Sequence, residues 1–333
     1  MIWGAVDPAV AALAAWFALA VDRWLGEPPL RWHPVVWIGH YLGWAGKRIA
    51  PLAGAAVPER DLASFWRGVL AWCAGAAFVV TCALALQLGL QWLPAWGQMI
   101  ALGLLLKPLL AWKMLKNEVI AVESALAESL PRGRERLSWL CSRDTASLSE
   151  SEVRETALES LAENLNDSVV APLFWFAIAG LPGAALYRFA NTADAMWGYR
   201  GERSGRVWEW AGKWAAQVDD LLSWLPARLT ALLLALAAGG LSPDRLRHEA
   251  RITPSPNGGW PMGALALALG IRLGKPGVYT LNAAGLAPGP HDTARACALA
   301  GRALALLWFV SLIVLVGQIL STASWSASGA WHG

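Results

Sequence analysis

Acidic residues recur at every fourth position in one stretch of the chain, at Glu155, Glu159, Glu163 and Asp167. Ser149 and Glu152 have the spacing of a capping box, and no Gly or Pro follows before Pro172, so we predict a helix over 149–167. On a helix this spacing stacks the carboxylates on one slowly turning stripe, where neighbours repel by roughly 0.2–0.5 kcal/mol per pair. The stripe is either a solvated face or a site that binds something positive, and both interpretations stay open.

A second polar set follows the next apolar run, at Asn191, Asp194, Tyr199 and Arg200. Mg²⁺ takes one or two carboxylates and completes its shell with waters and phosphate oxygens. We therefore predict a site for Mg²⁺ with a nucleotide phosphate, formed by Asp194 together with Glu163 or Asp167.

Two arginines are candidates to bind the phosphate oxygens, Arg143 and Arg200. The alternative is local pairing of Arg143 with Asp144 and of Arg200 with Asp194. Asp219 and Asp220 precede a short apolar run near Arg228, and a local ion pair would explain them.

Other candidates carry weaker signals. His33 follows a rigid turn after the first apolar run, and an interfacial position is favoured over a ligand contact. Lys107 interrupts an apolar run, where a charge is costly. It is therefore functional, or its side chain extends to the membrane surface, or it pairs with a buried loop. The segment 253–261, rich in Pro and Gly, is predicted to be a turn or a ligand loop.

Composition restricts the class of protein. Of 333 residues 56% are apolar and only 15% charged, which argues against two soluble domains. The 22 tryptophans often flank apolar runs, as at a membrane interface. A net charge of +3 without a basic aromatic face argues against nucleic acid as a partner. The four cysteines form neither a zinc motif nor a disulfide framework.

Apolar runs predict an all-α polytopic membrane protein with about four full transmembrane helices, at 8–21, 68–93, 99–115 and 299–320. Gly180-Leu181-Pro182-Gly183 interrupts the run 169–190, so we predict a re-entrant hairpin there. The short runs 229–238 and 260–271 are predicted to be further partial insertions.

Basic residues gather in the loops 22–67 and 113–168, which places both loops in the cytoplasm. We therefore expect one integral membrane domain over 1–333, in the bacterial cytoplasmic (inner) membrane, with the lipid bilayer as a partner and the site on the cytoplasmic side. The first apolar run is expected to be retained and not cleaved as a signal peptide.

Short motifs in a fixed order span most of the chain. They are Gly26 with Pro28, His33-Pro34, Arg143-Asp144-Thr145, Glu163-Asn164 with Asp167, Ala171-Pro172-Leu173-Phe174-Trp175, Asn191-Thr192 with Asp194, Asp219-Asp220, Ser255-Pro256-Asn257 and Gly259-Trp260-Pro261. In this order they resemble the CobD/CbiB family, the membrane-bound adenosylcobinamide-phosphate synthases of cobalamin biosynthesis.

The resemblance implies an ATP-dependent amide ligase. The free propionate carboxylate of a corrinoid, adenosylcobyric acid, would be joined to the amine of aminopropanol phosphate or aminopropanol through an acyl phosphate, with Mg²⁺ at the phosphates. Catalytic roles are then expected for Glu159, Arg143, Asp194 and Arg200, and metal binding for Glu163 and Asp167. Substrate contacts are expected from His33, Asn164, Asn191, Tyr199, Asn257 and Trp260.

Departures from the family pattern occur at Glu27, Ser168, Arg200 and Met262. Glu27 and Arg200 keep the charge of the usual residue, whereas Met262 removes a carboxylate, so no catalytic role carries over to it. A non-catalytic membrane sensor of related ancestry and a transporter are the competing classes, and only Lys107 fits a transporter. Association of protomers stays open.

Overall fold

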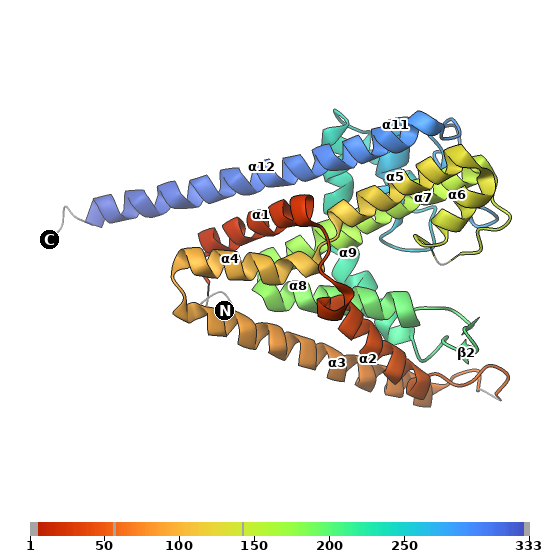
Figure 1. The fold of residues 1–333 in the computed structure, drawn as a ribbon, viewed down its shortest axis with the longest axis horizontal. Helices are drawn as coiled ribbons and strands as arrows, with labels where there is room; N and C mark the ends of the chain where they lie inside the picture. Colours follow the sequence, from red (N-terminus) through yellow and green to blue (C-terminus); the bar gives the residue numbers. More distant parts are fainter. Residues whose placement is uncertain (1–5, 56–57, 142, 330–333) are drawn as a thin grey trace.

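Helices make up almost all of the regular structure in the computed structural model, which describes residues 6–55, 58–141 and 143–329, with side chains up to Leu312 in the last helix. The helices are α1 (Pro8–Leu25), α2 (Pro34–Ile49), α3 (Leu62–Gly89), α4 (Ala95–Leu106), α5 (Trp112–Glu128), α6 (Leu130–Leu137), α7 (Glu150–Leu165), α8 (Ala171–Trp197), α9 (Lys213–Ala237), α10 (Pro243–Ala250), α11 (Gly259–Leu269) and α12 (Pro290–Gly329). Two antiparallel ribbons pair β1 (Glu202–Arg203) with β2 (Arg206–Val207) and β3 (Leu273–Lys275) with β4 (Tyr279–Leu281) (Figure 1). The predicted all-α class is confirmed.

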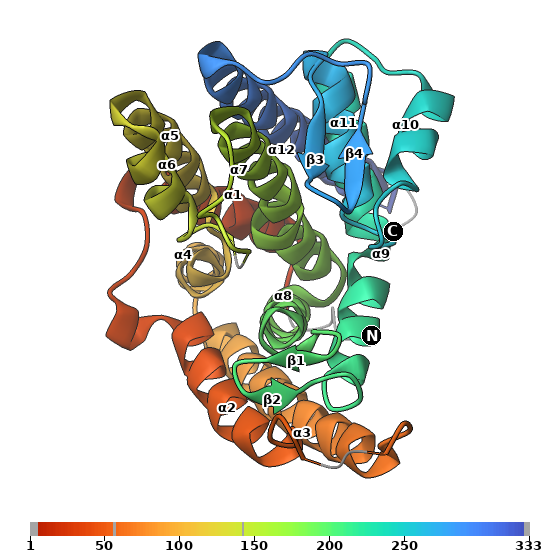
Figure 2. The ribbon, with the colours of Figure 1, turned by 90° about the vertical axis from the view of Figure 1, so that its right-hand side faces the viewer.

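Three carboxylates of the acidic stripe, Glu155, Glu159 and Glu163, lie on α7, and Asp167 lies in the segment that follows it. The capping box is present, because the Ser149 side chain accepts from the Glu152 backbone while the Glu152 carboxylate accepts from the Ser149 backbone. At its far end α7 passes into a π-helical segment, Asn166–Val170. Figure 2 shows α7 in the middle of the molecule, and it packs against α5, α6 and α11. Glu155 and Glu159 are therefore buried, whereas Asp167 is partly exposed and Glu163 is exposed.

The chain reverses direction within α8. Ala179 and Gly180 leave the helical conformation, and the Gly180 φ of +64° belongs to a region that side chains other than glycine rarely adopt. As a result the Tyr187 hydroxyl reaches Asp167 Oδ1 at 3.3 Å, although 20 residues of continuous helix would span about 30 Å. The segment is a helical hairpin with its bend at the glycine that the sequence indicated. That it re-enters the membrane stays a prediction.

A side chain from another helix fixes this bend. The Gln87 carboxamide oxygen of α3 accepts from the Leu181 backbone N–H at 2.8 Å. A Cβ at position 180 would lie 2.4 Å from that oxygen, so glycine is required for space as well as for conformation. The bend is thus part of the packing between α3 and the hairpin.

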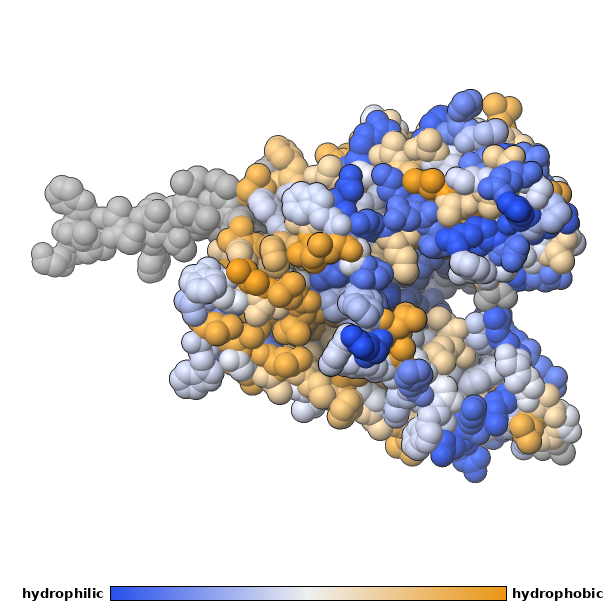
Figure 3. Space-filling model, in the orientation of Figure 1, coloured by the Kyte–Doolittle hydropathy of each residue, from blue (hydrophilic) through white to orange (hydrophobic). Residues whose placement is uncertain are grey.

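Six segments are long and apolar enough to cross a membrane: Pro8–Leu25, Leu62–Trp92, Ala95–Glu128, Glu150–Trp197, Lys213–Ala237 and Pro290–Leu312. Four of them overlap the predicted full spans. Glu150–Trp197 contains the hairpin, and α9 is longer than the predicted insertion 229–238 because the helix continues through charged residues that interrupt the apolar run. In Figure 3 apolar surface gathers over the half that holds α1 and α4, and hydrophilic residues cover the opposite end.

Candidate functional site

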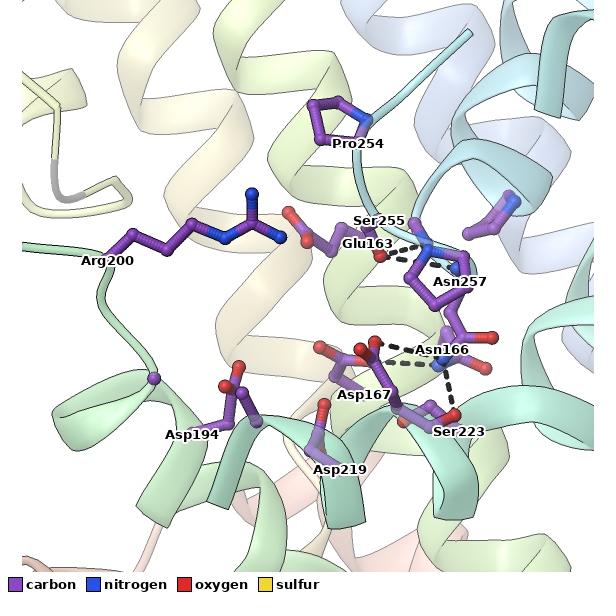
Figure 4. Close-up of a pocket in the computed structure, with 16 residues that line it drawn as sticks. Glu163, Asn166, Asp167, Asp194, Arg200, Asp219, Ser223, Pro254, Ser255 and Asn257 are labelled. Atoms are coloured by element: carbon purple, nitrogen blue, oxygen red, sulfur yellow. Dashed lines mark hydrogen bonds between the residues drawn. The ribbon is translucent and has the colours of Figure 1, made fainter. Parts of the chain in front are cut away.

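A cavity of about 490 Å³ lies where the end of α7, the end of α8, α9 and the loop before α11 meet (Figure 4). Its lining includes Glu163, Asn166, Asp167, Asp194, Arg200, Asp219, Asp220, Ser223, Ser255 and Asn257. Five residues predicted for the site, from three distant parts of the sequence, therefore share one cavity: Glu163, Asp167, Asp194, Arg200 and Asn257.

Asp167 is the most tightly held carboxylate in this cavity. Its Oδ1 accepts from the Asn166 carboxamide at 2.7 Å and from the Tyr187 hydroxyl, and its Oδ2 accepts from the Asn191 carboxamide at 3.1 Å. The same Asn191 nitrogen lies 3.5 Å from Asp219 Oδ1. The hairpin thus sets Asp167 in a fixed orientation. Asn191 contacts two carboxylates and is outside the lining of the cavity, and its expected contact with substrate stays a prediction.

Asp219 and Asp220 bring two further carboxylates from α9. The Asn257 carboxamide donates to the Asp220 backbone oxygen at 2.7 Å and lies 3.5 Å from its carboxylate. Arg228 does not pair with either carboxylate among the described contacts. Its guanidinium donates to Asn257 Oδ1 at 3.1 Å, so the expected local ion pair is wrong. Only the tertiary fold, which places α9 against the hairpin, reveals these two carboxylates as site residues.

The cavity holds more negative charge than its neighbours neutralise. Among the described residues, no ion pair within 4.0 Å involves Glu163, Asp194, Asp219 or Asp220. Arg200 is exposed and extends across the cavity toward Glu163 (Figure 4), and the alternative of an Asp194–Arg200 pair is not seen. Carboxylates that share one cavity without cationic partners are costly, and either protons or a cationic ligand can relieve that cost.

The loop before α11 forms the remaining wall. Ser255 Oγ accepts from the Asn257 and Gly258 backbone N–H groups at 3.2 and 3.1 Å, and Thr253 donates to the Ser255 carbonyl. These bonds hold the turn that starts α11 and direct Asn257 toward α9. The segment 253–261 thus contributes to the cavity, with Pro254, Pro256, Gly258 and Pro261 also lining it.

Arg143 and Glu159 lie outside this lining. Arg143 donates to Glu159 at 2.9 Å and to the Thr156 hydroxyl at 3.1 Å, and Glu159 is 2% exposed. The expected partner Asp144 instead accepts from the Ala146 backbone. Because helical positions four apart drift around the axis, Glu159 faces Arg143 and Tyr279 while Glu163 reaches the cavity.

His33 lies at a separate ionic cluster. Its Nε2 is 3.1 Å from Glu27, and Lys107 Nζ is 2.9 Å from Glu27 and 3.2 Å from Asp22. Lys107 therefore pairs with the buried Asp22 near the end of α1 and with Glu27 in the turn after it, so the predicted pairing with a loop is seen. This cluster borders a different, mainly apolar cavity of about 1080 Å³.

The other predicted contacts are distributed around the main cavity. The Tyr199 hydroxyl bonds to the Ala195 carbonyl, and the Asn164 carboxamide donates to the Ser160 carbonyl, so neither lines the cavity. Trp260 lines an adjoining pocket. Ser168 and Met262, where the sequence departs from the family pattern, are both buried. The Ser168 hydroxyl accepts from Arg188 at 3.2 Å, and Met262 Sδ lies 3.9 Å from the Tyr279 hydroxyl.

The donor set suits a hard cation. The lining offers carboxylate, carboxamide and hydroxyl oxygens, which Mg²⁺ prefers, and includes neither thiol nor imidazole. In the part of the chain that the structure describes, no group of three His, Cys, Asp or Glu side chains is arranged to hold a metal by itself.

Comparisons with known proteins agree with this picture. A sequence profile described as CobD/Cbib protein matches residues 15–323. Cobalamin biosynthesis protein CobD of Rhodobacter capsulatus is 39% identical over 325 residues, covering 90% of this chain and 96% of that protein. The protein of the same name from Chromobacterium violaceum is 39% identical, covering 91% and 96%.

A more distant relative extends the comparison. The probable cobalamin biosynthesis protein CobD of Methanothermobacter thermautotrophicus is 36% identical, covering 80% of this chain and 84% of that protein. No solved structure matches the chain significantly. Since the profile and these relatives cover nearly the whole chain, it belongs to the CobD/CbiB family of cobalamin biosynthesis proteins.

Proposed function

We propose that this protein is an ATP-dependent amide ligase that joins adenosylcobyric acid to aminopropanol phosphate or aminopropanol, with the acidic cavity as its site. One observation carries the proposal. Carboxylates from the end of α7, the end of α8 and α9 converge on a cavity in which Arg200 is the only arginine or lysine of the lining. Such a site suits an ammonium group and Mg²⁺-bound phosphates together.

The reaction divides into two steps. A propionate oxygen of the corrinoid attacks the γ-phosphorus of ATP, the bond from that phosphorus to the β–γ bridging oxygen breaks, and ADP leaves. The amine nitrogen then attacks the acyl carbon, the carbon–oxygen bond to phosphate breaks, and inorganic phosphate leaves. The ammonium loses two protons in total, one to a protein carboxylate and one to the departing phosphate. These steps depend mainly on positioning and charge neutralisation.

The proposed residue roles follow the geometry. Glu163 and Asp167 would hold Mg²⁺, which neutralises charge on the phosphates when bound, and Arg200 would bind phosphate oxygens. Asp194 replaces Glu159 as the proposed proton acceptor, because Asp194 lines the cavity whereas Glu159 is buried against Arg143. Arg143 and Glu159 are instead proposed to hold α7 in position.

Purified protein in detergent, incubated with adenosylcobyric acid, ATP, Mg²⁺ and each amine, tests the proposal. We expect a product with the mass of the amide, formed only with ATP and accompanied by an equal amount of ADP. Release of AMP would contradict the acyl phosphate route. Corrinoid binding without any product would support the non-catalytic sensor and overturn the proposal.

A further inference from the structure

A second pocket, basic where the first is acidic, adjoins the site. It has a volume of about 620 Å³ and is lined by Trp224, Arg228, Arg247, Ala250, Arg251, Thr253, Pro254, Ser255, Pro256 and Trp260. The segment Pro254–Pro256 lines both pockets, so the two pockets adjoin at this turn. We name the second one the arginine pocket.

Arg228 is held by several neighbours in this pocket. Its guanidinium carbon lies 4.1 Å from the Trp224 ring centre and 4.9 Å from that of Trp260, so it makes cation–π contacts with both indoles. It also donates to the Trp224 and Pro256 carbonyls and to Asn257. Asn257 in turn donates to Asp220, which connects the arginine pocket to the acidic cavity through one side chain.

Arg247 and Arg251 are the free charges of the pocket. Both are exposed, they come from α10 and its C-terminal end, and among the described residues neither has a carboxylate within 4.0 Å. Three guanidinium groups without an acidic partner repel one another, and an anion between them would relieve that repulsion. The planar fork of arginine binds phosphate oxygens in pairs.

We propose that the arginine pocket binds the phosphate group of the amine substrate, so that the ammonium at the other end of the same short molecule points into the acidic cavity. This inference rests on the proposed function and deepens it, because it assigns a phosphate subsite and selects aminopropanol phosphate over aminopropanol. Charge complementarity carries it: adjoining pockets of opposite charge match a small molecule with an ammonium at one end and a phosphate at the other.

The double variant Arg247→Gln/Arg251→Gln is the test. Both side chains are exposed and have no ion pair with any residue that the structure describes, so the fold should tolerate their loss. Arg245→Gln, on the same helix but outside the lining, is the matched control. We expect the KM for aminopropanol phosphate to rise roughly 30-fold or more in the double variant. The KM values for aminopropanol and for ATP should change less than about threefold, and the control should behave as the parent.

Binding without turnover separates this inference from the proposed function. The parent protein in neutral detergent is titrated calorimetrically with aminopropanol phosphate, without ATP or corrinoid, and we expect it to bind. The double variant should lose this binding. Aminopropanol at equal concentration should not compete for it. That result supports the subsite even if no amide is formed.

Three outcomes would overturn the subsite. Equal binding to parent and double variant excludes a role for these arginines. A raised KM for ATP alone assigns the pocket to the nucleotide. If the double variant differs from the parent only after vesicles containing phosphatidylglycerol are added, the pocket binds a lipid headgroup and not the substrate.

Discussion

Asn191 donates a hydrogen bond to Asp167 across the hairpin at 3.1 Å, although 24 residues separate them in the sequence. This contact orients the carboxylate that the stripe contributes to the cavity. Asp194, one helical turn beyond Asn191, lines the same cavity with no side-chain donor among the described hydrogen bonds. The two aspartates therefore share a site but differ in how the fold holds them.

That difference predicts different effects of the same substitution. Asp167→Asn places a carboxamide against donors and should lower stability by about 1–3 kcal/mol as well as turnover. Asp194→Asn disturbs no donor and removes an unpaired charge, so we expect an unchanged or higher Tm with turnover reduced at least tenfold. At low Mg²⁺ the turnover of Asp167→Asn should be lowest, and excess Mg²⁺ should partly restore it. The turnover of Asp194→Asn should not depend on added Mg²⁺. Equal loss of Tm in both variants would contradict these roles.

Gly180→Ala tests the bend in α8. The φ of +64° and the 2.4 Å approach to the Gln87 oxygen both oppose a Cβ, so we expect a loss of about 1–3 kcal/mol or more, seen as a lower Tm in detergent. Gly39→Ala is the control, because a Cβ at that position in α2 meets nothing within 4 Å. That variant should be as stable as the parent or slightly more stable. Similar Tm values for all three proteins would refute the packing argument.

The hairpin was predictable because its signal is local. Gly180 and Gly183 interrupt an apolar run, and glycine is required where the chain bends back. The capping box of α7 is local in the same way. The convergence of Asp219 with Asp167 is not local, since it depends on how α9 packs against the hairpin. In the sequence, Asp219 stands near Arg228, and a simple ion pair explained it equally well.

Membrane topology follows from the same contacts. Because Asn191 and Asp167 touch, both ends of the hairpin lie at one level, and we predict that the segments before α7 and after α8 are on the same side of the membrane. Cysteines introduced at Ser147 and Ser204, in a variant without native cysteines, should react with an impermeant thiol reagent from the same face. A cysteine at Ala95, the first residue of α4 after the turn from α3, should react from the other. Labelling of Ser147 and Ser204 from opposite faces would overturn the hairpin topology.

A double variant can show whether the ion pair of Arg143 and Glu159 has a structural or a catalytic role. Arg143→Met leaves the buried Glu159 carboxylate without its partner and should cost about 3–5 kcal/mol. Adding Glu159→Gln removes that charge, so the double variant should regain most of the Tm and keep turnover within about threefold of the parent. A stable double variant whose turnover stays roughly 30-fold low would instead support the catalytic role expected from the sequence.

The last prediction concerns Glu27, which joins His33 to Lys107 outside the cavity. Burial opposes its charge, but the hydrogen bonds and charges of His33 and Lys107 outweigh this and hold the pKa of Glu27 below its usual value of 4.5. A carboxyl whose pKa is lowered by folding stabilises the protein above its unfolded pKa, and this contribution is lost as the pH falls through the folded pKa.

Glu27→Gln should therefore have a lower Tm than the parent at pH 7, and the difference should shrink as the pH falls below about 4.5. Glu59→Gln, at an exposed position with no ion pair among the described contacts, should match the parent throughout. The comparison is a series of thermal melts in detergent from pH 7 to pH 3. A difference between Glu27→Gln and the parent that does not shrink below pH 4.5 would show that the carboxylate charge is not what stabilises this cluster, and that the Glu27→Gln variant loses stability through packing alone.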